Sequence, residues 1–508
     1  MEHPNKLSDY VARTFAFDLR SLAVFRIALG LLVLSDLVFR LPTLVAMTSG
    51  EGLFTRQLSF DCHQTHLGEA WSSSVWSLFW ISDTIEFSYT LFAIAAIAAV
   101  FLIIGKWTRW ATFVCWLIVA SLHARNPMIT SSADSMFKMM LFWSIFLPLG
   151  KKWSADSRNE ENNLNHVLSI ATIGYSFQLF ALYFFPGIAK WNDIWFNGEA
   201  MSYVLRLDIY IREFGSSLLE YPGLLTAITW ITLAAEVFLI LTLFLPWKNS
   251  AWRMINMLVF VAFHIGIALS LGIGLFSAIC IVAWLPLIPT TVWKLWLPAK
   301  GNGPDNATQQ TPVFGWNEKS LPGLAAELFC VLALIIVVAW NVANIEHEST
   351  KPLRVPIIQQ TGHLLALDQH FQMFGVPPKE NPWFVYEALL ANGKQIDIWR
   401  EREVDLEKPD SGLTVFPDFH WRKLHRNALY PTNEFVRQPM LDYVVRRWNE
   451  NHDEHEQVTR ARLICYREPI GPDYNNSDRY SHTWATYQNE DAQPGSLFDS
   501  LLESDDPF

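Results

Sequence analysis

The chain has 508 residues, of which 51% are hydrophobic, 14% are aromatic and only 17% are charged, and it carries 23 tryptophans. This composition excludes an ordinary soluble protein and indicates a polytopic α-helical membrane protein. The formal net charge of −11 argues against a nucleic-acid partner, because phosphate binding needs clustered lysines and arginines and the chain has no basic stripe.

Nine apolar segments are candidates for membrane spans, since a helix needs about 20 apolar residues to cross a bilayer. The polar residues 1–21 precede the first segment, which resembles a signal anchor because no small-residue cleavage site follows it. Two segments are short, and the pair around Gly272 and Gly274 also fits one re-entrant unit, so the number varies by one or two. The predicted transmembrane domain covers residues 22–344, with spans near 22–45, 87–105, 110–124, 135–150, 164–188, 224–246, 254–271, 273–289 and 323–344.

The distribution of basic residues predicts the orientation. With the N-terminus in the cytoplasm, most loop lysines and arginines fall on the cytoplasmic side of nine spans. The loop 46–86 then lies outside, and Arg56 is its only basic residue. This positive-inside pattern predicts insertion in the inner or plasma membrane, with the C-terminal region extracytoplasmic.

A soluble domain is predicted beyond the last span. Residues 301–315 have the composition of a linker before that span, and the hydropathy falls after residue 345. We therefore predict an extracytoplasmic α+β domain over residues 345–488. The last twenty residues, 489–508, contain no lysine or arginine and are predicted to be disordered.

The soluble domain contains a clear β-hairpin signal. Residues 382–390 and 395–399 alternate between apolar and polar side chains, and Asn392-Gly393 between them is typical of a type I′ turn. Residues 458–466 also alternate and are predicted to join the same sheet. Helical spacing over 424–449 predicts a helix between these strands.

Charged or titratable residues inside the predicted spans need a reason, because each costs about 2.5 to 3.5 kcal/mol at the membrane centre. Two pairs are spaced four residues apart and are predicted to be local ion pairs, Asp36 with Arg40 and Asp134 with Lys138. Arg26 has no such neighbour and is predicted to meet Glu327 or Glu236 from another span. The residues considered are Arg26, Asp36, Arg40, Asp134, Lys138, Glu236, His264 and Glu327.

Lys190 follows the apolar run 164–188, in which Pro186 and Gly187 loosen the last turn. Desolvation favours a neutral amine, which is a base. The alternative is an interfacial anchor, since Trp191 and Trp195 flank the lysine and amphipathic side chains of this kind gather at headgroups. Both interpretations stay open at this point.

Glu236 and His264 are each the single titratable residue of an apolar stretch, at depths of about 18 Å and 12 Å from the outer face at 1.5 Å per residue. A cavity in the outer half of the membrane would reach both of them and Lys190, and we name these three residues as catalytic candidates. The alternative is structural: His264 bonds a carbonyl, and Glu236 is protonated and paired. His123, Arg125, Asn126 and Asp134 lie at the same face and are candidates for the rim of the site.

No metal site is predicted, because Cys62, His63 and His66 form an incomplete ligand set in one outer loop. Cys62 and Cys465 are the two cysteines on the outer side, where a disulfide between them is one hypothesis.

Several motifs together resemble the vitamin K-dependent γ-carboxylases and their bacterial relatives, the HTTM (horizontally transferred transmembrane) family. They occur in the family's order over most of the chain. They are Arg20–Ala23 with Phe25–Gly30, Arg125-Asn126-Pro127, Phe146–Gly150, Gly187–Trp191 with Trp195, Gly198 and Ala200, His264–Ala268, and Leu367-Asp368-Gln369 with Met373-Phe374.

The resemblance implies that Lys190 is the base that deprotonates a reduced quinone of the vitamin K or menaquinone type. It also implies oxygen and carbon dioxide as co-substrates and a protein or peptide substrate held by the soluble domain. We assign Trp191, Trp195, Asn126 and Asp134 as cofactor-binding candidates. The chain departs from the animal carboxylases at 131–134, where Ser-Ser-Ala-Asp replaces a segment with an Asn-His pair, which puts glutamate carboxylation itself in doubt.

Two hypotheses of different classes follow. The first is a quinol-dependent carboxylase or oxygenase-type enzyme, a carbon–carbon lyase, with a lysine base at the outer membrane face. The second is a non-catalytic membrane protein that binds a lipid or escorts and protects a partner protein. A transporter is less supported, because the two halves show no matching interrupted helices.

Overall fold

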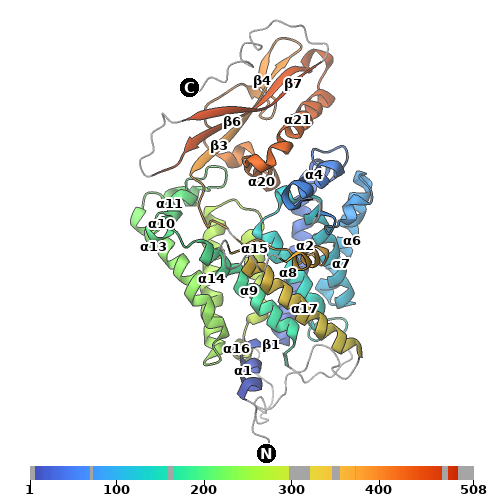
Figure 1. The fold of residues 1–508 in the computed structure, drawn as a ribbon, viewed down its shortest axis with the longest axis vertical. Helices are drawn as coiled ribbons and strands as arrows, with labels where there is room; N and C mark the ends of the chain where they lie inside the picture. The colour runs from blue at the N-terminus through green and yellow to red at the C-terminus, as the bar shows by residue number, and fades with distance from the viewer. Residues whose placement is uncertain are drawn as a thin grey trace, which may run out of the picture.

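The computed structural model describes residues 6–68, 72–157, 165–296, 321–345, 355–371, 373–471 and 479–489. A bundle of long helices forms one end of the molecule and a β-sheet domain forms the other, with the N-terminus at the far end of the bundle (Figure 1). The predicted linker 301–315 and nearly all of the predicted tail lie outside the described residues.

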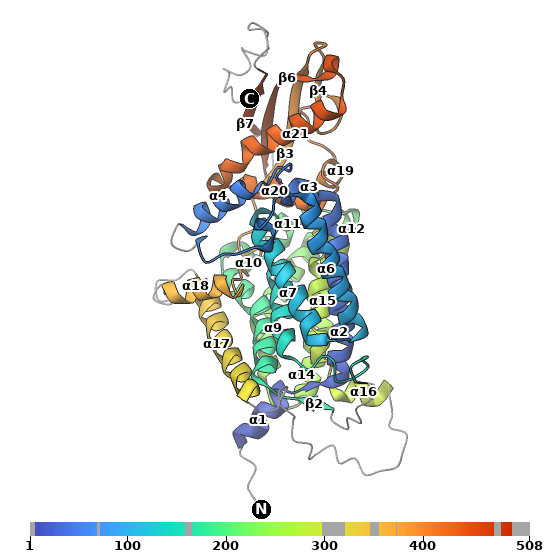
Figure 2. The same ribbon diagram turned by 90° about the vertical axis from the view of Figure 1, so that its right-hand side faces the viewer.

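The bundle is built from long apolar helices that run between the N-terminal end and the sheet domain (Figures 1 and 2). Gly30 of α2 shows how closely they pack, since a Cβ there would lie 2.6 Å from Ile103 Cγ1 of α6. Near the N-terminal end, β1 (Phe17–Asp18) pairs with β2 (His166–Val167). The bundle helices are α1 (Lys6–Phe15), α2 (Leu19–Arg40), α6 (Ile85–Ile104), α7 (Thr108–Arg125), α8 (Ser132–Phe146), α9 (Ile170–Ala189), α13 (Pro222–Ala234), α14 (Asn249–Ser270), α15 (Phe276–Ala283), α16 (Thr290–Trp296) and α17 (Leu321–Ala343).

Shorter helices cover the end of the bundle that faces the sheet domain. They are α3 (Leu44–Thr48), α4 (Arg56–Leu67), α10 (Asp193–Phe196), α11 (Ala200–Val204), α12 (Glu213–Leu218) and α18 (Pro356–Leu364).

Five helices of the described chain are long and apolar enough to cross a membrane, or six if the bent pair Phe276–Leu287 and Thr290–Trp296 forms one span. The other long helices of the bundle, α7, α8 and α9, do not combine the same length and apolarity. The chain is therefore a helical membrane protein with a C-terminal β-sheet domain, but the nine predicted spans are not confirmed. The five are Leu19–Thr48, Ile85–Ile104, Pro222–Phe244, Asn249–Ser270 and Pro322–Ala343.

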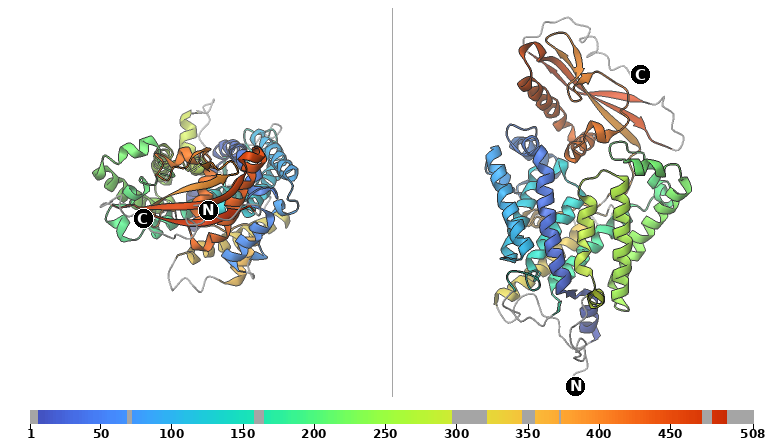
Figure 3. Two further views of the ribbon diagram at one scale, coloured as in Figure 1. Left: turned by 90° about the horizontal axis from the view of Figure 1, so that it is seen from above. Right: turned by 180° about the vertical axis from the view of Figure 1, so that it is seen from behind.

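The sheet domain has five antiparallel strands in the order β5-β4-β3-β6-β7. The predicted hairpin is confirmed as β3 with β4, and the predicted third strand is confirmed as β6, which pairs with β3 so that Tyr386 lies opposite Leu463. The predicted type I′ turn is wrong, because only Gly393 of the Asn392-Gly393 pair has a positive φ, 81°, and a type I′ turn needs a positive φ at both central residues. Figure 3 shows the domain from above and from behind. The strands are β3 (Glu380–Leu390), β4 (Gln395–Asp397), β5 (Arg402–Glu403), β6 (Val458–Pro469) and β7 (Tyr480–Gln488).

The helix predicted over 424–449 is wrong in its boundaries. The structure has α20 (Phe419–Ala428) and α21 (Arg437–Asn451), with the 3₁₀ turn Pro431–Val436 between them. Pro431 cannot continue the first helix, because proline has no N–H to donate. The second helix packs against β6 and β7 and contributes Met440, Val444 and neighbouring side chains to the core of this domain.

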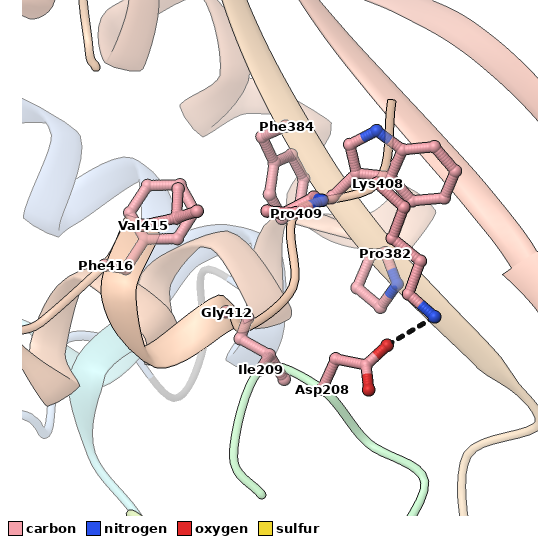
Figure 4. A pocket seen from close by; sticks show the side chains of 10 residues that line it. Asp208, Ile209, Pro382, Phe384, Lys408, Pro409, Gly412, Val415 and Phe416 are labelled. Carbon is pink, nitrogen blue, oxygen red and sulfur yellow. Dashed lines mark ion pairs between the residues drawn. The ribbon is translucent and has the colours of Figure 1, made fainter. Parts of the chain in front are cut away.

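The sheet domain docks on the bundle through polar contacts. Lys408 Nζ lies 2.5 Å from Asp208 of the bundle (Figure 4). It also lies 2.5 Å from Glu468 of β6. Beside this cluster, Gly412 of α19 (Gly412–Val415) packs its backbone on the bundle loop, where a Cβ would lie 2.5 Å from Ile209 Cα. The close contact fixes the sheet domain against the helices.

Some predicted pairings of buried charges are wrong. Asp36 and Arg40 form the expected local pair at 2.9 Å. Asp134, however, accepts from Arg40 at 2.7 Å, and Lys138 pairs with Asp368 at 2.8 Å, so no Asp134–Lys138 pair forms.

The predicted partner of Arg26 is also wrong. Its guanidinium donates to the carbonyl of Trp153 at 2.7 Å. Glu327 accepts from the backbone N–H of Ile170 at 3.0 Å, and Glu236 is paired elsewhere.

The disulfide hypothesis is wrong as well, since Cys62 and Cys465 are both free and buried. Cys62 Sγ lies 3.5 Å from His66 Nδ1 on the same helix, and Cys465 lies within β6.

Candidate functional site

Lys190 caps the C-terminus of α9, at the end of the bundle that faces the sheet domain (Figure 1). Pro186 lies inside the last turn, and its carbonyl accepts the backbone N–H of Lys190 at 3.0 Å. The side chain turns inward, so that only 3% of the residue is exposed. This burial does not fit an anchor that reaches the headgroups. The adjacent Trp191, in contrast, is 59% exposed.

The partner of Lys190 is Glu236, whose Oε2 lies 2.6 Å from the lysine Nζ. Glu236 belongs to the π-helical turn Ala235–Leu239, which continues α13. Such turns add one residue to a helix and re-aim its side chains, and they are frequent at functional sites. Gly187 permits the approach of α9, because a Cβ there would lie 2.9 Å from Val237 Cγ2 and 3.1 Å from Glu236 Cβ.

The pair lies at the wall of a cavity of about 290 Å³. Apart from Lys190 and Glu236 the lining is almost entirely apolar, with side chains from α11, α12, α13 and α14. Phe214 contributes to the lining and is 48% exposed, so the cavity reaches the surface of the bundle. Met373 and Phe374 close it from the segment that leads to the sheet domain.

Trp195 fixes one wall of this cavity. The indole is fully buried, and its ring centre lies 5.2 Å from the lysine Nζ, which adds a cation–π contact. Its Nε1 donates to the carbonyls of Phe374 at 3.0 Å and Gly375 at 3.1 Å. Phe374 adopts a left-handed backbone with φ of 55°, a conformation that aromatic residues rarely take and that surrounding contacts must hold.

His264 does not join the pair. Its Nε2 shares a 3.0 Å hydrogen bond with the hydroxyl of Tyr183, which also accepts from Trp284 Nε1 at 3.0 Å. Phe260 and Phe263 pack around these rings, and within the described residues the His264 Nδ1 has no hydrogen-bond partner. The depth of His264 was consistent with the lysine cavity, but its rotation about α14 directs it into an aromatic cluster.

The remaining cofactor-binding candidates lie elsewhere. Trp191 lines a separate cavity of about 830 Å³ with Asn341 and Asn344 from α17 and the residues after it. Asn126 holds a turn, since its Oδ1 accepts from Met128 N at 3.1 Å. Asp134 lines a third cavity of about 190 Å³. Of the four candidates, only Trp195 borders the cavity that holds Lys190.

The sequence did not reveal the π-helical turn or the role of the segment after the last bundle helix as a cavity wall. In the sequence, Met373-Phe374 is recognisable only as part of a family motif. No group of His, Cys, Asp or Glu among the described residues is arranged to hold a metal ion.

Comparison with protein-family models matches the HTTM domain over residues 16–293, which is more than half of the chain. Comparisons with curated proteins and with solved structures gave no match. The matched range contains α2 to α15, and thus Lys190, Glu236 and most of the cavity between them. The chain is therefore a membrane protein of the HTTM family, which is related to the vitamin K-dependent γ-carboxylases.

Proposed function

We propose that this protein is a membrane enzyme that uses the Lys190–Glu236 pair to remove a proton from a reduced quinone or a related hydroxy-aromatic lipid. The observation that carries the proposal is a buried amine–carboxylate contact of 2.6 Å at the wall of an apolar cavity. Isolated charges are costly in such surroundings, and a pair is the form in which they persist.

The pair has room for one more proton. With one proton shared between amine and carboxylate it is neutral overall, whichever group holds the proton. When the shared proton lies on Glu236, the neutral amine of Lys190 is the proton acceptor, and a hydroxyl of a bound lipid that releases its proton to this amine converts the pair to ammonium and carboxylic acid. In an apolar site this transfer needs no reorganisation of water, which is the advantage of a fixed, enclosed acid–base group.

The cavity fits the headgroup of a quinone. Its volume of about 290 Å³ lies near the lower end of roughly 300 to 1,000 Å³ that is typical of small-molecule sites. The indole of Trp195 offers a flat wall for a ring, and Lys190 and Glu236 supply the polar contact at one end. A reduced quinone bound there would supply an acidic hydroxyl. The opening beside Phe214 leads to the bundle surface, from which a lipid would enter.

The proposal stops at proton removal from the lipid. Glutamate carboxylation is not included, because Asp134 lies in the segment that departs from the animal carboxylases, and its carboxylate is bound by Arg40 at 2.7 Å. We further propose that the sheet domain and the lysine cavity share the extracytoplasmic side. Trp195 and Asn192 support this arrangement, since both donate to the segment 374–375 that leads into the sheet domain.

A non-catalytic lipid-binding protein is the second candidate, favoured by the larger cavity that the exposed Trp191 lines. Lys190→Arg separates the two functions in cells that depend on the protein. Arginine keeps a positive charge beside Glu236 but does not give up its proton. We expect loss of function at normal abundance. The matched control is Lys248→Arg, because Lys248 also lies against a tryptophan, with its Nζ 4.7 Å from the ring centre of Trp247. Full function of Lys190→Arg would refute the proposed chemistry.

The ligand is tested by mass spectrometry of lipids that co-purify with the full chain in mild detergent. Gly266 lines the cavity, and a Cβ there would have no atom within 4 Å, so Gly266→Leu places an added side chain at the cavity wall. We expect the wild type to retain a quinone and Gly266→Leu to lose it. Gly223→Leu, also in open space but outside the cavity, is the control. Equal retention by both variants would place the lipid elsewhere.

A further inference from the structure

A second polar cavity lies at the sheet-facing end of the bundle, apart from the lysine cavity. Its volume is about 190 Å³, and α4, α7, α8 and α18 contribute to its lining. Figure 2 shows α4 and α18 at this end of the bundle. Its titratable lining residues are His63, His66, His123, Asp134, Lys138, His363 and Asp368.

The carboxylates that line the cavity are already occupied by donors. Asp134 Oδ1 accepts from Arg40 at 2.7 Å, and its Oδ2 accepts from both the backbone N–H and the hydroxyl of Ser131 at 2.7 Å. Asp368 Oδ1 accepts from Lys138 at 2.8 Å. At least three of the four carboxylate oxygens therefore already accept a hydrogen bond, which disfavours a ligand that mainly donates hydrogen bonds, such as an amine.

Donors, in contrast, remain in excess. The ammonium of Lys138 has three N–H groups, and within the described residues Asp368 is its recorded partner. His123 is 7% exposed, and its Nε2 has no hydrogen-bond partner in the described part of the chain, with Asp134 Oδ1 at 3.4 Å. Buried polar atoms are normally satisfied, so an orphaned ring nitrogen at a cavity wall points to a ligand.

The charges around the cavity limit the charge of that ligand. Arg40, Lys138 and Lys423 face the carboxylates of Asp36, Asp134 and Asp368, so these groups cancel. A monoanion therefore adds only one uncompensated charge, which the remaining N–H donors of Lys138 and His123 can contact, whereas a doubly charged anion adds two. The four histidines are not arranged to hold a metal.

We propose that this cavity binds a small carboxylate-type monoanion, of the size of formate or acetate, through Lys138 and His123. Lys138 supplies a positive charge and hydrogen bonds. His123 donates from Nε2, in the tautomer that carries its proton on that nitrogen.

Isothermal titration calorimetry on the full chain in detergent tests the proposal, with sodium formate as the probe and sodium chloride at equal ionic strength as the reference. We expect saturable formate binding that Lys138→Met and His123→Phe each weaken at least tenfold. Lys106→Met, at an exposed lysine, is the matched control and should bind as the wild type does. If Lys138→Met does not fold, His123→Phe still tests the site, because this second substitution removes no charge.

Three results would overturn the inference: no saturable formate heat in the wild type, unchanged affinity in folded variants of both residues, or competition by zinc at lower concentration than formate. Displacement of formate by an acetylated glutamate amide would assign the site to side-chain carboxylates rather than to free acids. Lys190→Arg, which keeps a cation beside Glu236, should leave formate affinity unchanged, which keeps this test independent of the quinone proposal.

Discussion

A double-mutant cycle on Lys190 and Glu236 measures whether their contact behaves as a buried ion pair. The two side chains are 4% and 6% exposed and 2.6 Å apart, so the values for buried pairs apply rather than those for surface pairs. Removal of one partner leaves the other charge unpaired in an apolar wall. We therefore expect Lys190→Met and Glu236→Leu each to destabilise the protein by about 3 to 5 kcal/mol.

The double variant should be more stable than either single variant. Two apolar side chains of similar size leave no charge to bury, and such replacements are often neutral or stabilising by about 1 to 4 kcal/mol. Thermal unfolding of the purified full chain in detergent, followed by tryptophan fluorescence, ranks the four proteins by midpoint.

A double variant that melts below both single variants would refute this account, as would single variants that cost less than about 1 kcal/mol, the range of exposed pairs. The cycle also separates structure from chemistry. Because the double variant keeps the fold but has no proton acceptor, we expect it to be abundant and inactive in cells that depend on the protein.

Three further predictions concern other contacts. Gly187→Ala places a methyl group against the π-helical turn that carries Glu236 and should lower the free energy of unfolding by about 1 to 3 kcal/mol. Gly223→Ala is the control, because the added methyl group meets open space and should not lower the stability. Equal melting midpoints of the two variants would contradict the close approach of α9. Burial alone would lower the pKa of Lys408, but its hydrogen bonds to two carboxylates outweigh burial and raise the pKa. The stability that Lys408 contributes should therefore be complete below the usual lysine pKa of about 10.4 and be lost above it, so wild type and Lys408→Met should differ in midpoint at pH 8 and converge as the pH rises past 11. Burial raises the pKa of the Cys62 and Cys465 thiols to about 12. A maleimide at pH 8 should therefore label both cysteines only after unfolding. Labelling of the native protein would contradict their burial.

Local patterns predicted the sheet well. The hairpin depends on an Asn-Gly turn between alternating strands, and both signals lie within twenty residues. Where the outcome depended on distant partners, the sequence was a poorer guide. Spacing of four residues identified the Asp36–Arg40 pair, yet the same spacing failed for Asp134 and Lys138, because Arg40 and Asp368 compete for these groups from other elements.

The candidate site shows the same limit. Hydropathy gives the depth of a residue in a span but not its rotation about the helix axis, so Glu236 and His264 were equally plausible partners for Lys190. The π-helical turn at Ala235–Leu239 determines which way Glu236 points, and the steric freedom of Gly187 lets α9 reach it. Neither feature leaves a periodic signal that distinguishes it from an ordinary apolar helix.

The choice of cation at buried pairs distinguishes structural sites from candidate chemical sites in this chain. Arg40 bridges Asp36 and Asp134, and Arg125 pairs with Asp83. For such fixed contacts arginine is the better residue, because its planar guanidinium donates hydrogen bonds to several acceptors and keeps its proton.

Two buried lysines line cavities with their own side chains, whereas neither Arg40 nor Arg125 lines either of these two cavities. Lys190 and Lys138 are 3% and 5% exposed, and each contacts one carboxylate beside a hollow space. A lysine is a weaker clamp than arginine but has a proton that it can exchange and N–H groups left for a ligand. We therefore expect Lys190→Arg to preserve folding while it abolishes function. A Lys190→Arg variant that keeps function would show that this pair, like those of the arginines, only holds the bundle together.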